Sequence, residues 1–219
     1  MSRNIEFSIG EYYHIYNRGV EKRAIFLDFL DRERFVKLLY TANSTTPVHL
    51  SNYQGLTLIE IPRGDQIVDI GAWCLMPNHF HLLLKEKVEN GISLFMQKLL
   101  TGYSMYFNTK NRRKGSLFEG TFNAKHLDSD EYLKYQYAYI HLNPISIVDK
   151  GWKNKQILNK STAEKFLQKY AYSSYLDYCG KTRMESAIIN LKEFPEYFST
   201  GDDFMLMMED WINFDKYQG

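Results

Sequence analysis

Cysteine is rare in this chain, and long hydrophobic runs are missing from it. The 219 residues include two cysteines, Cys74 and Cys179, which lie far apart and outside any CxxC pair. A zinc site built from cysteines is therefore not expected. No apolar run approaches the roughly 20 residues of a membrane-spanning helix, and residues 1–6 lack the apolar core of a signal peptide. The sequence predicts a cytoplasmic protein with no membrane segment.

The chain also has almost no net charge, because 27 basic residues nearly balance 26 acidic ones. The distribution is uneven. Residues 185–219 contain eight acidic and two basic side chains, which leaves 25 basic and 18 acidic ones in residues 1–184. A moderately basic body suits a phosphate-rich partner, and the acidic tail either shields that surface or is simply solvated.

The hydrophobic pattern predicts strands interspersed with helices. Strands are expected at 12–17, 56–61, 67–75, 79–84 and within 117–127, and helices at 29–42, 92–107 and 129–143, with weaker helical pieces around 161–178 and 202–212. This order suits an α+β fold of the ferredoxin-like type, with an antiparallel sheet and helices packed on one face. We expect one domain in residues 1–150 and a C-terminal helical extension with an acidic tail in residues 151–219.

Two histidines flank one phenylalanine at His79-Phe80-His81. Residues i and i+2 of a strand point to the same side, so both imidazoles project from one face and could share a cation. For an isolated HxH, two surface or hydrogen-bonded histidines are the commoner explanation. Here the pair follows the break at Pro77-Asn78 within an apolar segment, where polar side chains need partners, and this position favours a functional role.

Tyr139 and Asn143 lie four residues apart in a tyrosine-rich segment that ends at Pro144. Residues i and i+4 of a helix share a face, so the phenol and the carboxamide point together. His141 is about 200° round the helix from Tyr139, and we expect it to be structural. His14, on the first predicted strand, either approaches the site or is a structural histidine, and we expect the second.

These residues together supply the parts of a site that cuts a phosphodiester bond: two imidazole ligands, one amide ligand and a nucleophile. The pKa of an ordinary tyrosine is about 10, so ionising it at pH 7 costs about 4 kcal/mol. A divalent ion offsets part of this cost by polarising the phosphate oxygens and by favouring the phenolate. The product would be a covalent phosphotyrosine that stores the bond energy for a later rejoining step.

Five stretches carry a family resemblance: YHIYNRGVEKRAIF (13–26), AWCLMPNHFHLLLK (72–85), GSLFEGTFNAKHLDSDEYL (115–133), YIHLNPI (139–145) and YAYSSYLDY (170–178). The chain resembles the HUH single-tyrosine transposases, most closely the REP-associated tyrosine transposases of the IS200-like group. The combination of PNHxHLL with YIHxNP at this separation is the most specific part of the resemblance.

The resemblance implies a ferredoxin-like, metal-dependent enzyme that cleaves single-stranded DNA and transfers strands. It implies that His79 and His81 hold a divalent ion, Mg²⁺ or Mn²⁺, and that Asn143 completes the metal shell. Tyr139 would attack the DNA phosphate to give a 5′-phosphotyrosine and a free 3′-OH. The substrate would be single-stranded DNA with hairpin or repeat ends, and residues 1–150 would be the catalytic domain. The resemblance leaves two oligomeric states possible: a homodimer that exchanges the tyrosine helix, or a monomer.

Two basic groups are candidates for contacts with DNA phosphates. They are Arg18, Lys22 and Arg23 after the first strand, and Lys110, Arg112, Arg113 and Lys114 after the second long helix. Solvated loops are the alternative reading of both. The chain also departs from many relatives, which carry an arginine shortly after the NP pair where this chain has Ile145-Ser146-Ile147. The insertion around 43–62 is longer than expected for the family.

Two other functions are compatible with the sequence. A structure-specific DNA-binding protein that has been retained without cleavage activity would keep the same fold and the same basic surface. A small-molecule metallohydrolase using His79 and His81 would normally need further His, Asp or Glu ligands, and no such residue lies at a persuasive spacing.

Overall fold

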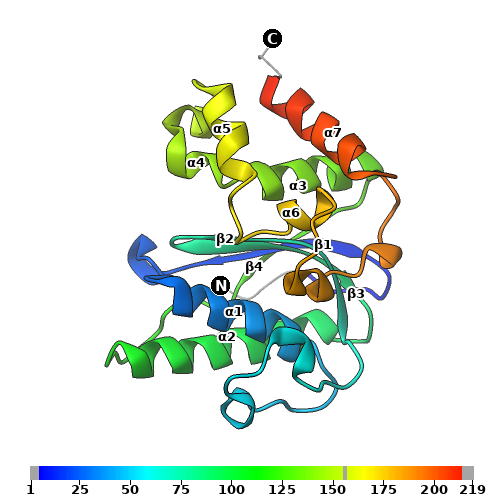
Figure 1. The fold of residues 1–219 in the computed structure, drawn as a ribbon. Coiled ribbons are helices and arrows are strands. Elements are labelled where there is room, and N and C mark those ends of the chain that lie inside the picture. The colour runs from blue at the N-terminus through cyan, green and yellow to red at the C-terminus, as the bar shows by residue number, and fades with distance from the viewer. Residues whose placement is uncertain (1–4, 155–156, 214–219) are drawn as a thin grey trace.

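The computed structural model describes residues 5–154 and 157–213. Its strands are β1 (Tyr12–Arg18), β2 (Val68–Met76), β3 (His79–Glu86) and β4 (Asn123–His126). Its α-helices are α1 (Phe29–Thr41), α2 (Gly91–Lys110), α3 (Asp130–Leu142), α4 (Ile145–Val148), α5 (Lys160–Leu167), α6 (Tyr175–Tyr178) and α7 (Gly201–Asn213). The sheet forms a central layer between α1 and α2 on one side and α3 to α7 on the other (Figure 1).

The four strands form one sheet in the order β2-β3-β1-β4. Every neighbouring pair is antiparallel. With α1 between β1 and β2 and α2 between β3 and β4, this is the ferredoxin-like arrangement that the sequence predicts. The α+β class is therefore confirmed.

The prediction that the helices pack on one face of the sheet is correct for α1 and α2 but wrong for α3. Phe35 of α1 and Tyr103 of α2 pack with Phe80 on one face, whereas Tyr137 of α3 belongs to a separate core on the other face. The physical reason lies in the sheet, because all nine residues of β2 are buried. A strand that is apolar on both sides needs cover on both sides.

Residues 56–61, predicted to form a short strand, instead contain a 3₁₀ turn at Leu58–Glu60. Thr57 and Glu60 close it as a capping box, in which the backbone N–H of Thr57 donates to the Glu60 carboxylate at 2.8 Å. Leu58 and Ile61 point into the core. Local capping thus satisfies backbone polar groups of this segment without a neighbouring strand.

The C-terminal extension covers the outer edge of β2 and the outer face of α3. The backbone N–H of Leu75 donates to the Tyr172 carbonyl, and that of Ser174 to the Trp73 carbonyl, both at 2.9 Å. Three apolar side chains of α7 are buried against α3 and its neighbours: Phe204, Met208 and Ile212. The described part of the acidic tail is therefore packed onto the body. Residues 214–219 lie outside the described residues, and the division at residue 150 stays a prediction.

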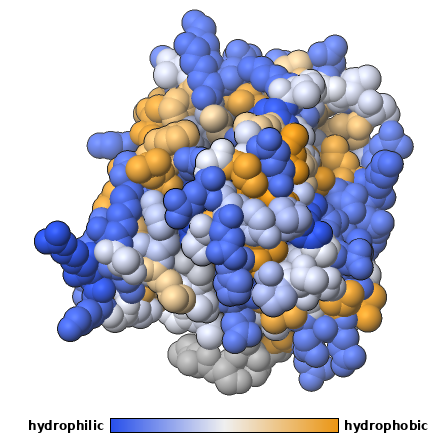
Figure 2. Space-filling model, turned by 60° about the horizontal axis from the view of Figure 1, so that its bottom comes forward, coloured by the Kyte–Doolittle hydropathy of each residue, from blue (hydrophilic) through white to orange (hydrophobic). Residues whose placement is uncertain are grey.

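Figure 2 brings the side of α1 and α2 forward and shows scattered hydrophobic patches among hydrophilic side chains. Within residues 5–154 and 157–213, no helix is both long and apolar enough to span a bilayer.

Candidate functional site

The two histidines of the HxH motif lie on the face of the sheet that α3 covers. In the antiparallel register, Tyr16 of β1 pairs with His81 and Arg18 pairs with His79. The ring centroids of the two histidines are 4.9 Å apart. Phe80 points the other way into the core under α1 and α2, as the alternation of a strand requires.

Helix α3 brings Tyr139 to the same place. The helix begins at a Ser129 cap, whose side chain accepts from the backbone N–H of Tyr132, and it ends at Leu142 just before Asn143 and Pro144. The Tyr139 ring centroid is 5.4 Å from that of His81 and 5.9 Å from that of His14. The nucleophile candidate and the ligand candidates of one chain therefore meet.

Asn143 connects the two halves of this cluster. Its carboxamide makes polar contacts with His79 and with Tyr139: the first raises the pKa of His79, and the second lowers the pKa of Tyr139. The residue is 5% exposed, so its amide is largely shielded from solvent. The four residues predicted from the motifs thus form one spatial group.

The tautomer of His79 follows from its hydrogen bonds. The Asn78 side-chain N–H donates to the Lys22 carbonyl at 3.1 Å, which turns the amide oxygen of Asn78 towards His79. That oxygen can only accept, so Nδ1 of His79 donates to it at 2.7 Å. Burial is the largest influence on the His79 ring and lowers its pKa to about 4. The ring is neutral at pH 7, and its Nε2 carries a lone pair.

His81 has a different partner, which the sequence did not reveal. Its Nδ1 lies 2.9 Å from Nε2 of His14. Its Nε2 is buried and makes no hydrogen bond among the described residues. Burial, with smaller effects of His14 and His79, holds the pKa of His81 well below its usual range.

This donor set fits a divalent ion. A buried ring nitrogen without a hydrogen-bond partner needs an explanation. Metal coordination provides that explanation, because a neutral imidazole can offer its lone pair to a metal ion. His79, His81 and the amide oxygen of Asn143 supply two nitrogen donors and one oxygen donor. The described residues contain no cluster of three or more His, Cys, Asp or Glu side chains placed to hold a metal, so a closed structural zinc site is not formed there.

The environment of Tyr139 opposes its ionisation on balance. Burial, the largest influence, raises the pKa of the phenol, whereas Asn143 and the positive charge of Lys125 act in the opposite direction. The hydroxyl is therefore protonated at pH 7 in the protein alone. Lys125 on β4 is the second residue near the site that the sequence motifs did not single out.

The first basic group lies at the His79 end of the site. The charge of Arg18 reaches His79 and contributes to lowering its pKa, and its guanidinium lies 3.3 Å from the carboxylate of Glu119. Residues 18–20 run beside residues 117–119, since the backbone N–H of Val20 donates to the Leu117 carbonyl and that of Glu119 to the Arg18 carbonyl. The first basic group thus lies against the segment that follows the second one in the sequence.

The members of these groups differ in their partners. Lys110 is held between two carboxylates, at 2.7 Å from Asp28 and 2.6 Å from Asp31. Arg113 donates to the Asn108 side chain. Lys22, Arg112 and Lys114 are exposed, whereas Arg23 is half-buried beside Glu21.

His141 has a structural role, as the helical geometry suggested. Its Nδ1 donates to the Tyr137 carbonyl at 2.9 Å, and its Nε2 lies 2.8 Å from the Ser174 hydroxyl. The ring is fully buried, and burial lowers its pKa to about 3. This histidine fastens α3 to the segment that covers β2 and does not join the cluster at Tyr139.

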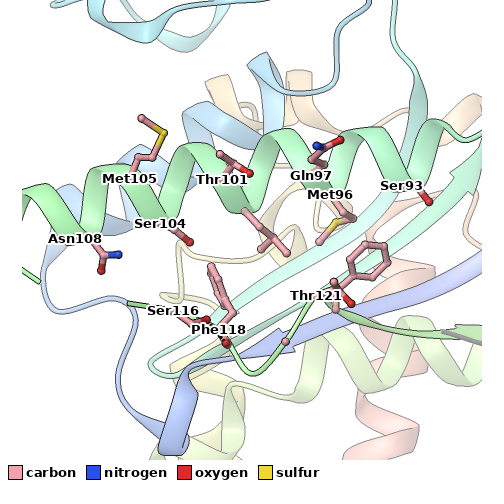
Figure 3. A pocket seen from close by; sticks show the side chains of 13 residues that line it. Ser93, Met96, Gln97, Thr101, Ser104, Met105, Asn108, Ser116, Phe118 and Thr121 are labelled. Carbon is pink, nitrogen blue, oxygen red and sulfur yellow. Dashed lines mark hydrogen bonds between the residues drawn. The ribbon is translucent and has the colours of Figure 1, made fainter. Parts of the chain in front are cut away.

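A cleft of about 490 Å³ lies on the opposite side of the sheet, between α2 and the segment that leads into β4. Figure 3 shows side chains of both elements lining it, including Gln97, Ser104, Phe118 and Thr121. Its lining is apolar or uncharged polar and includes no histidine, cysteine or acidic residue. The candidate catalytic residues therefore lie under α3 and not in this cleft.

Comparisons with known proteins relate part of the sequence and the fold to a family. Residues 57–143, which include all four clustered residues, match the family model of IS200-like transposases. A solved structure of a REP-associated tyrosine transposase bound to a REP hairpin is similar, with a TM-score of 0.51 and 12% identity over 84% of this chain and 90% of that chain. No curated protein matches the sequence. The predicted resemblance is thereby confirmed: residues 57–143 match the model of IS200-like transposases, and the fold is similar to that of a REP-associated tyrosine transposase.

Proposed function

We propose that this protein cleaves single-stranded DNA and transfers the cut strand through a covalent bond to Tyr139. The observation that carries the proposal is the meeting of Tyr139 with His79, His81 and Asn143 on one face of the sheet, with the Tyr139 and His81 rings 5.4 Å apart. A nucleophile beside a set of neutral metal ligands is the arrangement that phosphodiester transfer needs.

The chemistry of the proposal balances in a simple way. The Tyr139 oxygen bonds to phosphorus while the bond from phosphorus to the 3′ oxygen of the preceding nucleotide breaks. The phenol loses its proton and the departing 3′ oxygen gains one. The products are a 5′-phosphotyrosine and a free 3′-OH. In the reverse direction, a 3′-OH from another strand attacks the phosphotyrosine and releases Tyr139.

His79, His81 and Asn143 are the residues that would hold Mg²⁺ or Mn²⁺. A bound divalent ion would withdraw charge from the phosphate oxygens and favour the phenolate. The protein prepares this site in two ways. Burial keeps both imidazoles unprotonated, and hydrogen bonds from these rings to Asn78 and His14 fix the ring orientations.

The substrate class is inferred from the comparison and from charge. The similar solved protein binds a REP hairpin, and the Arg18 end of this site carries basic side chains. We infer that the substrate is single-stranded DNA with a hairpin or repeat end. Because the histidines and the tyrosine of one chain already meet, a monomer suffices for the chemistry, and exchange of the tyrosine helix in a dimer is not needed.

A cleavage assay tests the proposal. Labelled single strands from the DNA that flanks the gene, chosen to include hairpin-forming sequences, are incubated with the protein and Mn²⁺. The wild-type protein is expected to release a labelled fragment with a free 3′-OH, and Tyr139→Phe none. Tyr132→Phe is the matched control, because Tyr132 is a half-buried tyrosine two turns earlier on α3. Equal cleavage by Tyr139→Phe would reject the nucleophile assignment.

The same assay distinguishes the proposed function from its main alternative. A DNA-binding protein without cleavage activity would bind the hairpin strand with or without metal and release no fragment in any divalent ion. A metallohydrolase acting on small molecules is disfavoured because, in the described residues, no third His, Asp, Glu or Cys is placed to hold a metal together with the histidine pair.

A further inference from the structure

Lys125 occupies a defined place on the sheet face that carries the site. In the antiparallel pairing of β1 with β4, His14 lies opposite Lys125 and Ile15 lies opposite Ala124. Opposite residues of an antiparallel pair point to the same side. Ile15 and Ala124 pack into the core under α1 and α2, so Lys125 projects with His14 towards α3.

This placement brings a positive charge close to the reacting group. The His14 ring is 5.9 Å from the Tyr139 ring, and Lys125 is the direct neighbour of His14 across the strands. The positive charge of Lys125 acts on both His14 and Tyr139, since it contributes to lowering the pKa of each. His79 and His81 lie on the other side of β1, because the strand order is β3-β1-β4.

The Lys125 side chain is also available for a ligand. It is exposed, and no ion pair joins it to a carboxylate in residues 5–154 and 157–213. Lys110, by contrast, is already neutralised by Asp28 and Asp31. An unpaired ammonium beside a phosphate-transfer site is placed to attract the phosphate backbone.

We propose that Lys125 binds a backbone phosphate of the DNA strand next to the scissile phosphate, on the β4 side of Tyr139. The proposal rests on the function proposed above and adds a substrate-positioning residue to it. Arg18 marks the opposite end of the path. It lies four residues along β1 from His14, roughly 13 Å at about 3.3 Å per residue, so the two cations contact different phosphates. The bound strand would run along β1 from Arg18 to Lys125, past the histidines and Tyr139.

Equilibrium binding tests this inference without cleavage. The parent is Tyr139→Phe in EDTA, and the probe is a fluorescein-labelled single strand of 20 nucleotides joined to a hairpin end. Adding Lys125→Gln is expected to weaken binding about fivefold at low salt and to reduce the slope of log affinity against log salt by about 0.7, the value for one lost phosphate contact on a single strand. Lys125→Arg keeps the charge and should retain most of the affinity.

Lys134→Gln is the matched control, because Lys134 is an exposed lysine on α3 that pairs with Asp130. It should leave affinity and salt slope unchanged. Thermal midpoints confirm that each variant is folded. Arg18→Gln combined with Lys125→Gln should give the product of the two separate losses, since the contacts are independent.

The outcomes separate the two levels of the proposal. If the parent binds the strand and Lys125→Gln behaves like Lys134→Gln, the role of Lys125 is wrong while the proposed function stands. If the parent binds no single strand at any salt concentration, the proposed function fails and the role of Lys125 fails with it.

Discussion

The imidazole rings of His14 and His81 share a hydrogen bond of 2.9 Å between Nε2 of the first and Nδ1 of the second. When His81 donates, its buried Nε2 keeps a lone pair for a metal. In the other tautomer, that nitrogen would be a buried donor without a partner, which is unfavourable. The hydrogen bond therefore makes His14 a positioning residue for a metal ligand.

Replacing His14 by phenylalanine tests this relationship. His14→Phe keeps an aromatic ring of similar size but removes the acceptor for His81. Loss of an outer-shell partner typically weakens metal binding by about 10- to 100-fold, and we expect that range for Mn²⁺ in isothermal titration calorimetry. Binding of single-stranded DNA in EDTA should change little.

The control for His14 is His126→Phe. His126 is exposed, and it pairs with Glu11. Its variant should bind Mn²⁺ like the wild type. If His14→Phe also binds Mn²⁺ with wild-type affinity, the hydrogen bond does not orient the ligand and the tautomer argument is wrong.

The buried histidines predict a loss of stability in acid. Burial lowers the pKa of His14 and His141 to about 3 and that of His79 to about 4, whereas the unfolded chain titrates near 6.5. The unfolded chain therefore takes up protons first as pH falls. The free energy of unfolding should be constant above about pH 7 and should fall from about pH 6.5 towards pH 4, by about 1.4 kcal/mol per pH unit for each such group.

Urea unfolding at pH 7.5, 6.5, 5.5 and 5.0 measures this dependence. His141→Gln lacks one of the buried groups, and its stability should fall less steeply with decreasing pH. A free energy of unfolding that stays flat from pH 7.5 to pH 5.0 would mean that the histidines are not held neutral by the fold.

Lys110 is expected to stabilise the fold more than it binds DNA. Its ammonium lies 2.6 Å from the fully buried carboxylate of Asp31, and removing the partner of a buried charge is destabilising. Lys110→Met should lower the thermal midpoint by about 4 °C. Lys114→Met, at an exposed position of the same basic group, should shift it by less than about 1 °C. An unchanged midpoint for Lys110→Met together with weaker DNA binding would reverse this assignment.

Phe194 and Gly71 predict coupled effects on stability. The Phe194 ring packs over Gly71 so closely that a Cβ there would come within 2.6 Å of it. Phe194→Ala should lower the free energy of unfolding by about 3 kcal/mol, and Gly71→Ala by about 1–3 kcal/mol through the clash. The double variant should lose less than the sum, because the smaller side chain makes room for the Cβ.

Leu191→Ala is the control for this pair, since Leu191 is 45% exposed. It should change the free energy of unfolding by less than about 0.5 kcal/mol. If the losses in the free energy of unfolding were strictly additive in the Phe194 and Gly71 double variant, Phe194 of the extension would not pack against β2 as the structure indicates.

The parts of the structure that the sequence predicted are those with local signals. Alternation and helical spacing located β1, β3, α2 and α3, and spacing within each element placed His79 with His81 and Tyr139 with Asn143. His14 and Lys125 were missed as site residues because their positions depend on the register between strands. Helix α3 packs on the second face of the sheet through long-range contacts. The predicted arrangement, with all helices on one face, did not include this packing. The one available signal was that β2 is apolar at nearly every position, which indicates burial on both faces.

The most direct test of the account is to locate the covalent adduct. The wild-type protein is allowed to react with a labelled hairpin-bearing single strand in Mn²⁺, the DNA and protein are digested, and the peptides are analysed by mass spectrometry. The account predicts a nucleotide linked through its 5′ phosphate to the peptide that contains Tyr139, with none in Tyr139→Phe. Cleaved DNA accompanied by an adduct on another residue, or by no adduct, would contradict it.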